Sequence, residues 1–432
     1  MRCILLILDG IGDRGQAIFR GKTPLQAADT PNLDKIAQRG MCGLYHSSLQ
    51  GIPMPSEIAH FLMFGYDMDE FPGRGFIEAL GYDIPVQEDE VAILARIFSV
   101  SPHEGMMILT HENPDVDQET CRILHHEIKS FRYEGIEMEF VPTKGIQGIL
   151  ILRGDVSRDI TDSNPISEGE PLIEVCPLSQ SSRDKTAIQT ARALNRYLLW
   201  CYQRLSEHPI NQERIKRGLP PINALGAQRA GQRRIISPFR EKWGLKGLSI
   251  ASGPVFWGLA EFLGMDTMRE KDTKDMEADL RRRLELAKDA NAYDFIHVHT
   301  KMPDVASHTK DPVYKQQVIE TLDKALDFAV EHFVSDPGIL LVITADHATP
   351  SQGPMIHSGE TVPICITGKN ARQDRVAGFD EINAAPGALG LVKGKELMYL
   401  ILNGMDRAKL KGLMDCPEDQ PFTPGPYKPL RI

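Results

Sequence analysis

Four continuous apolar runs constrain the fold of this 432-residue chain more than any other feature. The runs are CILLIL, DFIHV, GILLVIT and VPICIT, and helical patterns alternate with them. All are far shorter than a membrane-spanning segment. Continuous apolar strands are typical of a mainly parallel sheet that helices cover on both faces. The sequence therefore predicts an α/β fold.

The chain is longer than the size at which a single hydrophobic core keeps growing, so a second domain is expected. From about residue 85 to about residue 174, short apolar segments alternate with polar turns such as ENPDVDQE. We predict an inserted α+β domain over residues 85–174 and a core domain made of residues 1–84 and 175–432.

The formal net charge of -10 argues against a nucleic-acid surface, which needs a basic footprint. The short basic run Arg281–Arg283 is interpreted as a solvated helix face. Seven scattered cysteines without a CxxC spacing indicate neither a disulfide framework nor a thiolate zinc site, so a cytoplasmic location is expected. The first apolar run stops at Asp9 and lacks a cleavage site, so it is interpreted as a strand rather than a leader.

Residues of metal-ligand type gather in three short segments near the C-terminal end. Asp304 and His308 are four positions apart, Asp346 and His347 follow the run GILLVIT, and His357 follows a short loop. Open α/β sheets hold ligands just beyond the carboxyl ends of their strands. A mixed carboxylate and imidazole set indicates a pair of divalent cations of the manganese or zinc kind, and two such metals favour phosphate chemistry.

The loop after the first run allows two readings. Gly10, Gly12 and Gly15 satisfy the dinucleotide fingerprint GxGxxG, but the following residues QAIFRGKTP show no helical periodicity. In the alternative, Asp9 is a metal ligand at a strand end, and the glycines let the chain turn close to a bound phosphate.

Ser56 follows Pro55 and precedes an apolar helical stretch, which is typical of a helix N-cap. A nucleophile at a helix N-terminus also gains from the backbone N–H groups when it carries phosphate. If Asp9, Asp346 and His347 hold a cation at Ser56, the catalytic role is favoured.

Several segments together resemble a known family over nearly the whole chain. They are LDGIGDRG, GKTPLQAADTPNLDKIAQRGMCGL, PSEIAH, GRGFIEALG, HPINQERIKRGLPPINALGAQRAG, FREKWGLKG, VHTKMPDVASH and TADHATP. The sequence resembles the archaeal-type cofactor-independent phosphoglycerate mutases of the alkaline phosphatase superfamily. The resemblance implies a phosphatase-like core and an inserted domain that caps the substrate.

The resemblance also implies a site with two divalent metals, manganese first, with zinc, cobalt or magnesium as alternatives. One metal would be held by Asp9, Ser56, Asp346 and His347, and the other by Asp304, His308 and His357. Ser56 would be phosphorylated transiently as 3-phosphoglycerate and 2-phosphoglycerate interconvert. Lys301 matches a family lysine near the phosphoryl group, Arg229 and Arg74 match family arginines, and Asn223 is a further substrate candidate.

Three positions depart from the family pattern: Leu94 replaces an arginine, Arg96 replaces an asparagine and Ile166 replaces a histidine. They keep open a related phosphotransferase or phosphatase that acts on another small phosphoester, such as a homoserine-kinase-like activity. A metal-binding protein that holds a phosphorylated metabolite without turnover is the third alternative. In each case the expected partner is a small phosphorylated metabolite, with neither nucleic acid nor membrane; the sequence predicts no oligomeric state.

Overall fold

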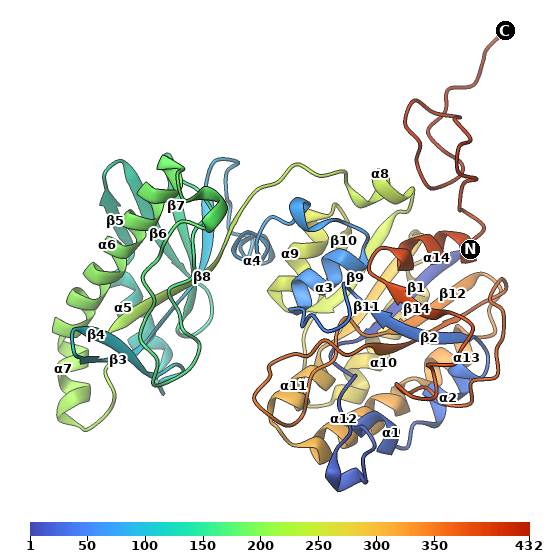
Figure 1. Ribbon diagram of the computed structural model, residues 1–432, viewed down its shortest axis with the longest axis horizontal. Helices are drawn as coiled ribbons and strands as arrows, with labels where there is room; N and C mark the ends of the chain where they lie inside the picture. The colour runs from blue at the N-terminus through green and yellow to red at the C-terminus, as the bar shows by residue number, and fades with distance from the viewer. The chain divides into compact units, whose positions relative to one another are not determined.

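The computed structural model describes residues 1–432, which form two compact units. Unit 1 consists of residues 1–71 and 236–432, and unit 2 consists of residues 72–235 (Figure 1). None of the helices combines the length and the hydropathy needed to cross a bilayer.

Unit 1 is built on an eight-stranded sheet with the order β10-β9-β11-β1-β12-β13-β2-β14. In that order the strands are Asp266–Glu270, Gly247–Ser252, Phe295–Thr300, Arg2–Leu8, Ile339–Thr344, Val362–Thr367, Met41–His46 and Gly390–Lys393. The first five strands are parallel, and β13 is antiparallel to both of its neighbours. The mainly parallel sheet confirms the predicted α/β class.

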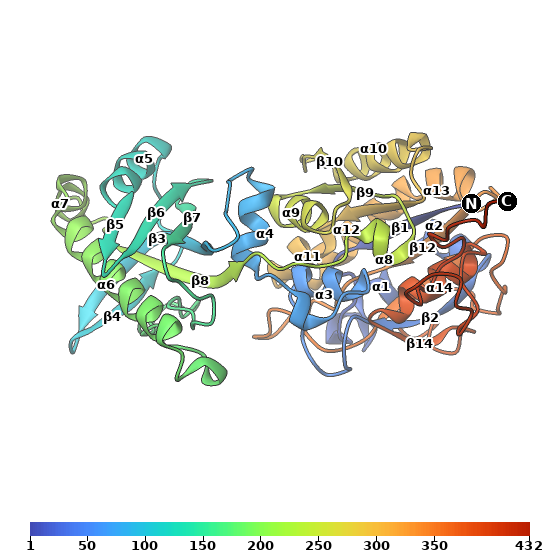
Figure 2. The same ribbon diagram turned by 90° about the horizontal axis from the view of Figure 1, so that it is seen from above.

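Helices lie on both faces of this sheet (Figure 2). The α-helices of unit 1 are α1 (Pro24–Ala27), α2 (Pro31–Ala37), α3 (Ser56–Met63), α8 (Phe239–Trp243), α9 (Pro254–Phe262), α10 (Met276–Asp289), α11 (Met302–His308), α12 (Pro312–Ala325), α13 (Asp327–His332) and α14 (Glu396–Gly404). Short 3-10 turns occur at Ala17–Phe19 and Met68–Glu70. Because both faces are covered, β1, β11 and β12 are buried almost throughout, which explains their continuous apolar runs.

Unit 2 holds a six-stranded antiparallel sheet. Its strands are β3 (Val91–His103), β4 (Met106–His111), β5 (Ser130–Tyr133), β6 (Ile136–Pro142), β7 (Gln147–Arg153) and β8 (Ala224–Gln232). Its helices are α4 (Arg74–Gly81), α5 (Gln118–Glu127), α6 (Lys185–Glu207) and α7 (Pro209–Lys216), with a 3-10 turn at Ser179–Ser181.

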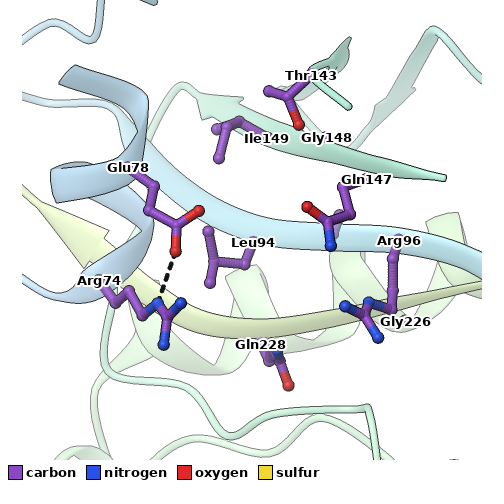
Figure 3. Close-up of a pocket in the computed structure, with 11 residues that line it drawn as sticks. Arg74, Glu78, Leu94, Arg96, Thr143, Gln147, Gly148, Ile149, Gly226 and Gln228 are labelled. Atoms are coloured by element: carbon purple, nitrogen blue, oxygen red, sulfur yellow. Dashed lines mark hydrogen bonds and ion pairs between the residues drawn. The ribbon is translucent and has the colours of Figure 1, made fainter. Parts of the chain in front are cut away.

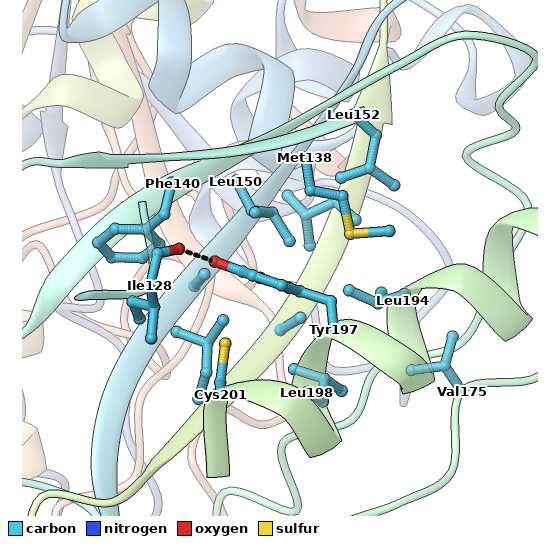
Figure 4. Close-up of a cluster of buried hydrophobic side chains, with 14 of the residues drawn as sticks. Ile128, Met138, Phe140, Leu150, Leu152, Val175, Leu194, Tyr197, Leu198 and Cys201 are labelled. Atoms are coloured by element: carbon cyan, nitrogen blue, oxygen red, sulfur yellow. Dashed lines mark hydrogen bonds between the residues drawn. The ribbon is translucent and has the colours of Figure 1, made fainter. Parts of the chain in front are cut away.

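The core of unit 2 lies between this sheet and the long helix α6 (Figure 4). Alternate residues of β3, among them Ile93 and Ile97, enter this core, as strand geometry requires. Tyr197 of α6 is fully buried and donates a hydrogen bond of 2.6 Å to the carbonyl of Ile128.

The inserted domain predicted over residues 85–174 lies within unit 2, which spans residues 72–235. The strands expected there form, but the unit extends further at both ends. At the N-terminal end, α4 packs on β3 and β8. At the C-terminal end, α6 completes the core and β8 pairs with β3.

A correction concerns the basic run on α10. Arg281 and Arg282 make exposed ion pairs, as a solvated face would, but Arg283 is fully buried. Its guanidinium donates to the carbonyl of His299 at 2.8 Å and to the carboxylate of Asp272 at 2.5 Å. Arg283 therefore holds the carboxyl end of β11 through the His299 carbonyl and does not face solvent.

Candidate metal and phosphoryl-transfer site

Three adjacent parallel strands of unit 1 end at the same level, and this places the site. In the register, Leu8 of β1 lies opposite Thr300 of β11, and Ile7 lies opposite Thr344 of β12. The residues that follow these strand ends therefore meet at one edge of the sheet, as expected for an open parallel sheet.

The first group of candidate ligands is Asp9, Asp346 and His347, whose ligand atoms all lie within 4.8 Å of one another. The His347 Nε2 atom is 3.1 Å from Asp346 Oδ2 and 3.5 Å from Asp9 Oδ1. Both of these oxygens are buried and have no hydrogen-bond partner. Buried carboxylate oxygens that converge on an imidazole without being satisfied fit a divalent cation.

The second group is Asp304, His347 and His357, also within 4.8 Å. His357 Nε2 is 3.4 Å from Asp304 Oδ1, and its ring stacks on that of His347 with centroids 3.8 Å apart. His308, expected as a third ligand here, has its Nε2 atom 3.2 Å from Asp304 Oδ1 but is more exposed and lies outside the tight group. The second group thus shares His347 with the first.

Hydrogen bonds orient the two histidines toward these groups. Thr349 donates to Asp304 Oδ1 at 2.8 Å, so its oxygen is left to accept from His347 Nδ1 at 3.1 Å. The Nδ1 atom of His357 lies 2.8 Å from the carbonyl of Met54, to which it donates. Both rings are thereby assigned the tautomer whose Nε2 lone pair faces the carboxylates, which is the arrangement of metal-binding histidines.

Ser56 lies beside both groups. It is the first residue of α3, whose N-cap is Pro55, so the expected N-cap position is corrected by one residue. The side chain makes no capping hydrogen bond; its Oγ atom is 3.0 Å from His347 Nε2 and 3.3 Å from Lys301 Nζ. The Ser56 hydroxyl therefore does not cap the helix, and it faces the two ligand groups.

Lys301 is the cation of the site. Its Nζ atom lies 3.2 Å from Asp304 Oδ2 and 3.6 Å from Asp9 Oδ2. Burial alone would lower the pKa of Lys301, but Asp9, Asp304 and Asp346 together raise that pKa above its ordinary value. The ammonium group therefore stays charged at neutral pH.

The carboxylates also stay ionised. Burial works against the charge of Asp304, yet hydrogen bonds from His308 and His357 and the charge of Lys301 hold the pKa of Asp304 well below its usual range. The pKa of Asp346 is likewise lowered, because His347 and His60 outweigh its burial. Asp304 and Asp346 therefore carry their negative charges at neutral pH and are available as anionic ligands.

Gly10 explains the glycine-containing loop after β1. Its φ is +69°, and a Cβ atom there would lie 2.8 Å from the Asp304 Cβ and 2.9 Å from its Cα. The loop continues without an α-helix, through a 3-10 turn at Ala17–Phe19, so the helix that a dinucleotide fingerprint needs does not follow. Because Gly10 has no side chain, the loop after β1 can approach Asp304 closely.

Three residues that sequence reasoning missed support the site. His299 Nε2 is 3.0 Å from Asp9 Oδ2, and His60 Nδ1 is 2.8 Å from the carbonyl of Ser56 and 3.4 Å from Asp346 Oδ2. Lys315, fully buried, donates to the carbonyls of Gly12 and Thr349 at 2.9 and 2.8 Å. The alternating histidines in FIHVHT were a visible signal for His299, since imidazoles are unusual in a buried strand.

The remaining predicted residues belong to unit 2. Arg74 pairs with Glu78 at 2.6 Å, and Arg229 has a positive φ of 59° and an exposed side chain. Asn223 is buried, and its side-chain amide bonds both the N–H and the carbonyl of Val100, at 2.9 and 3.2 Å. These contacts give Asn223 a structural role between β3 and β8.

Comparison with known proteins gives consistent results. Residues 37–211 match the sequence profile described as 2,3-bisphosphoglycerate-independent phosphoglycerate mutase. The chain is 41% identical to 2,3-bisphosphoglycerate-independent phosphoglycerate mutase 2 of Methanocaldococcus jannaschii, with 96% of this chain and 95% of that protein covered. A relative from Methanopyrus kandleri with the same description, apart from the number, is 34% identical over 95% of this chain and 98% of its own length.

Solved structures agree. A cofactor-independent phosphoglycerate mutase from Thermoplasma acidophilum is 28% identical, with a TM-score of 0.62 over 94% of this chain and 99% of that one. A Pyrococcus horikoshii protein reaches a TM-score of 0.76 at 28% identity, over 95% of this chain and 99% of that one.

Proposed function

The chain belongs to the 2,3-bisphosphoglycerate-independent phosphoglycerate mutase family, and on that premise we propose that it interconverts 3-phosphoglycerate and 2-phosphoglycerate through a phosphorylated Ser56. The observation that carries the proposal is the position of the Ser56 hydroxyl, 3.0 Å from His347 Nε2 and 3.3 Å from Lys301 Nζ, beside two groups of candidate metal ligands.

We propose that two divalent cations, manganese in the first place, are held by these groups. One cation would be held by Asp9, Ser56, Asp346 and His347, and the other by Asp304, His308 and His357. The imidazole of His347 lies within reach of both groups. When bound, such cations lower the pKa of a hydroxyl and offset charge on phosphoryl oxygens. The ionised carboxylates of Asp304 and Asp346 outnumber the single ammonium group of Lys301, so the site has the negative charge to retain the cations.

In the proposed reaction, Ser56 Oγ attacks the phosphorus of 3-phosphoglycerate in line with the bond to the C3 oxygen. The Oγ–P bond forms, the P–O bond to C3 breaks, and the proton lost by the Ser56 hydroxyl is balanced by the proton that the C3 oxygen takes up, so that glycerate stays in the site beside the phosphoserine. The charged Lys301 offsets negative charge on Oγ and on the phosphoryl oxygens as they approach. The C2 hydroxyl of the glycerate then attacks the phosphoserine: the C2 O–P bond forms, the Oγ–P bond breaks, a proton returns to Ser56 Oγ in place of the one lost by the C2 hydroxyl, and 2-phosphoglycerate is released.

The start of α3 gives the phosphoserine a favourable place. Ser56 is its first residue, so the positive end of the helix dipole lies next to the transferred group. The Nδ1 atom of His60, one turn further, donates to the Ser56 carbonyl and lies 3.4 Å from Asp346 Oδ2, which ties the helix start to the ligand group.

A coupled enolase assay with 3-phosphoglycerate and Mn²⁺ tests the proposal. We expect turnover in the wild type and none in Ser56→Ala. Release of inorganic phosphate without 2-phosphoglycerate, or transfer to an added alcohol such as homoserine, would favour the alternative phosphatase or phosphotransferase. Leu94 gives that alternative its support, since it lines a pocket of unit 2 with an apolar side chain where the family pattern has an arginine (Figure 3).

A further inference from the structure

Two of the seven free cysteines face each other across neighbouring strands of unit 1. Cys42 of β2 and Cys365 of β13 are directly opposite in the antiparallel register, and both are fully buried. Cys3, the other cysteine of this sheet, lies opposite Phe295 and Leu340 instead. Opposite residues of antiparallel strands project on the same face. The fold therefore brings together two thiols that more than 300 residues separate in the sequence.

The backbone pairing brings these two side chains as close as antiparallel strands allow. The N–H of Cys42 donates to Asp374 at 2.7 Å, and its carbonyl accepts from the N–H of Leu389 at 2.9 Å, so neither group bonds Cys365. The two cysteines thus form a non-hydrogen-bonded pair, in which opposite Cα atoms are about 4.5 Å apart. A disulfide needs Cα atoms roughly 4.4–6.8 Å apart. The sheet therefore holds the two thiols at a separation that a disulfide can bridge.

Both sulfur atoms lie under the last turn of α2. The Cys42 thiol donates to the carbonyl of Ala37 at 3.7 Å, and the Cys365 thiol donates to the carbonyl of Ile36 at 3.6 Å. The thiols also contact each other, because a hydrogen bond with Cys42, followed by burial, raises the pKa of Cys365 well above its ordinary value. The pair is therefore neutral and in contact while it is reduced.

A short surface turn covers the Cys365 sulfur. Helix α2 ends at Ala37, and the next two residues, Gln38 and Arg39, are exposed. A Cβ atom on Gly40 would lie 2.8 Å from the Cys365 sulfur, so no side chain of the turn fills that space. Short surface turns open locally at a much lower free energy than a central sheet. Local opening of this turn is enough to admit a molecule as small as hydrogen peroxide.

We infer that Cys42 and Cys365 form a reversible cross-strand disulfide when the protein meets hydrogen peroxide. One thiolate attacks a peroxide oxygen and becomes a sulfenic acid, and the hydroxide that leaves takes up the proton lost by the thiol. The second thiolate attacks the sulfenic sulfur, the S–S bond forms, and the S–O bond breaks to give a second water. Two thiols and one hydrogen peroxide thus give one disulfide and two waters, with two electrons passing from sulfur to oxygen.

The bond would join the two strands that lead to the candidate site. Strand β2 precedes Ser56 in the sequence, and β13 follows His357. A cross-link between residues so far apart restricts the unfolded chain strongly, so we expect the oxidised protein to be the more stable form. The inference does not depend on the proposed function, because neither cysteine belongs to the ligand groups.

Peptide mapping of the full-length protein after treatment with hydrogen peroxide tests this inference. Catalase removes the peroxide, and the chain is then unfolded in iodoacetamide, which alkylates all seven cysteines of the untreated protein. The treated protein should yield a peptide pair that joins Cys42 to Cys365 and that dithiothreitol separates. The melting temperature should rise by about 2 °C or more on oxidation and return on reduction.

Cys3→Ala is the matched control, since Cys3 is also fully buried in this sheet but faces no cysteine. This variant should keep the linked peptide and the shift in melting temperature. Cys42→Ala and Cys365→Ala should each lose both. If one of these two variants folds poorly, the other one and the peptide map of the wild type still decide the question.

Three results would overturn the inference. The first is alkylation of both Cys42 and Cys365 after peroxide treatment of the wild type. The second is a linked peptide that joins either of them to a different cysteine. The third is a Cys42–Cys365 bond that lowers the melting temperature, because such a bond would not fit the native sheet.

Discussion

Lys315 and Asp13 form a fully buried ion pair, with 3.1 Å between Nζ and Oδ2. Their positions in the sequence are 302 residues apart, yet the pair ties α12 to the loop after β1. Lys315 also donates to the carbonyl of Thr349, whose side chain orients His347 and Asp304. Through Thr349, the ion pair therefore helps to hold His347 and Asp304 in place.

Replacing Lys315 by Met should destabilise the protein strongly. The change leaves Asp13 as a buried charge without its cation, which typically costs about 3–5 kcal/mol of unfolding free energy. Urea denaturation measures this loss. Lys324→Met, on an exposed position of the same helix, should change the unfolding free energy by no more than about 0.5 kcal/mol. Equal stability of the two variants would show that the buried pair contributes nothing.

Ser56→Ala should abolish phosphoryl transfer and leave the fold intact. The variant lacks the oxygen that forms the bond to phosphorus, whereas the helix loses no cap, because Ser56 makes no capping hydrogen bond. Acid-stable labelling by phosphate from labelled substrate, together with the turnover rate, checks this. Ser182→Ala, an exposed serine of unit 2, serves as the control. A labelled, active Ser56→Ala protein would remove Ser56 from the mechanism.

His347→Gln should lose more metal than His308→Gln. The imidazole of His347 belongs to both ligand groups, whereas His308 approaches only Asp304 and is more exposed. Metal content per chain after dialysis against Mn²⁺, measured by plasma mass spectrometry, distinguishes the two. We expect both sites to weaken in His347→Gln and at most one in His308→Gln. The opposite order would mean that His347 is only a neighbour of the cations.

Removing the metal should lower the melting temperature. Chelation leaves the buried oxygens Asp9 Oδ1 and Asp346 Oδ2 without a partner, and a ligand present at 100 times its Kd stabilises a folded protein by about 2.7 kcal/mol. Differential scanning calorimetry with EDTA and then with added Mn²⁺ measures the shift. A melting temperature that does not respond to either reagent would contradict the proposed metal groups.

Glu381 should make stability depend on pH. Burial raises its pKa from 4.5 to about 7, although hydrogen bonds from Thr23 and the Asp13 N–H work in the opposite direction. Because the folded-state pKa is the higher one, its contribution is fully present below about pH 4.5 and is lost as the pH rises through about 7.

The stability lost between pH 5 and pH 8 should therefore be smaller in Glu381→Gln than in the wild type, by on the order of 3 kcal/mol. Urea denaturation at both pH values, in the presence of a chelator, measures the difference. Glu285→Gln, at an exposed position of α10, should behave like the wild type. Identical pH dependence in all three proteins would refute the role of Glu381.

Much of the site could be predicted because its residues directly follow apolar strands. Asp9 and Asp346 come within two positions of a strand end, so the rule for parallel sheets located them. Lys315 and Arg283 could not be found in this way. Their burial depends on partners such as Asp13, and a charged residue on a helix looks solvated until its partner is known.

The full extent of unit 2 could not be predicted for a similar reason. The pattern of α6 predicts a buried face but not the sheet that covers it, and β8 pairs with β3 across more than 100 intervening residues. Strand alternation did carry information that was not used. Leu94 and Arg96 share one face of β3, so the loss of an arginine at position 94 is accompanied by a guanidinium two residues away on the same face.

The central place of β1 between β11 and β12 has a consequence for biosynthesis. β1 ends at Leu8, whereas both of its neighbours lie far along the chain and end at Thr300 and Thr344. Unit 2 is continuous from residue 72 to residue 235 and contains its own core, so it can fold during translation. The apolar segment CILLIL must wait unpaired until β12 has emerged, and a chain that terminates before Thr344 exposes it to aggregation.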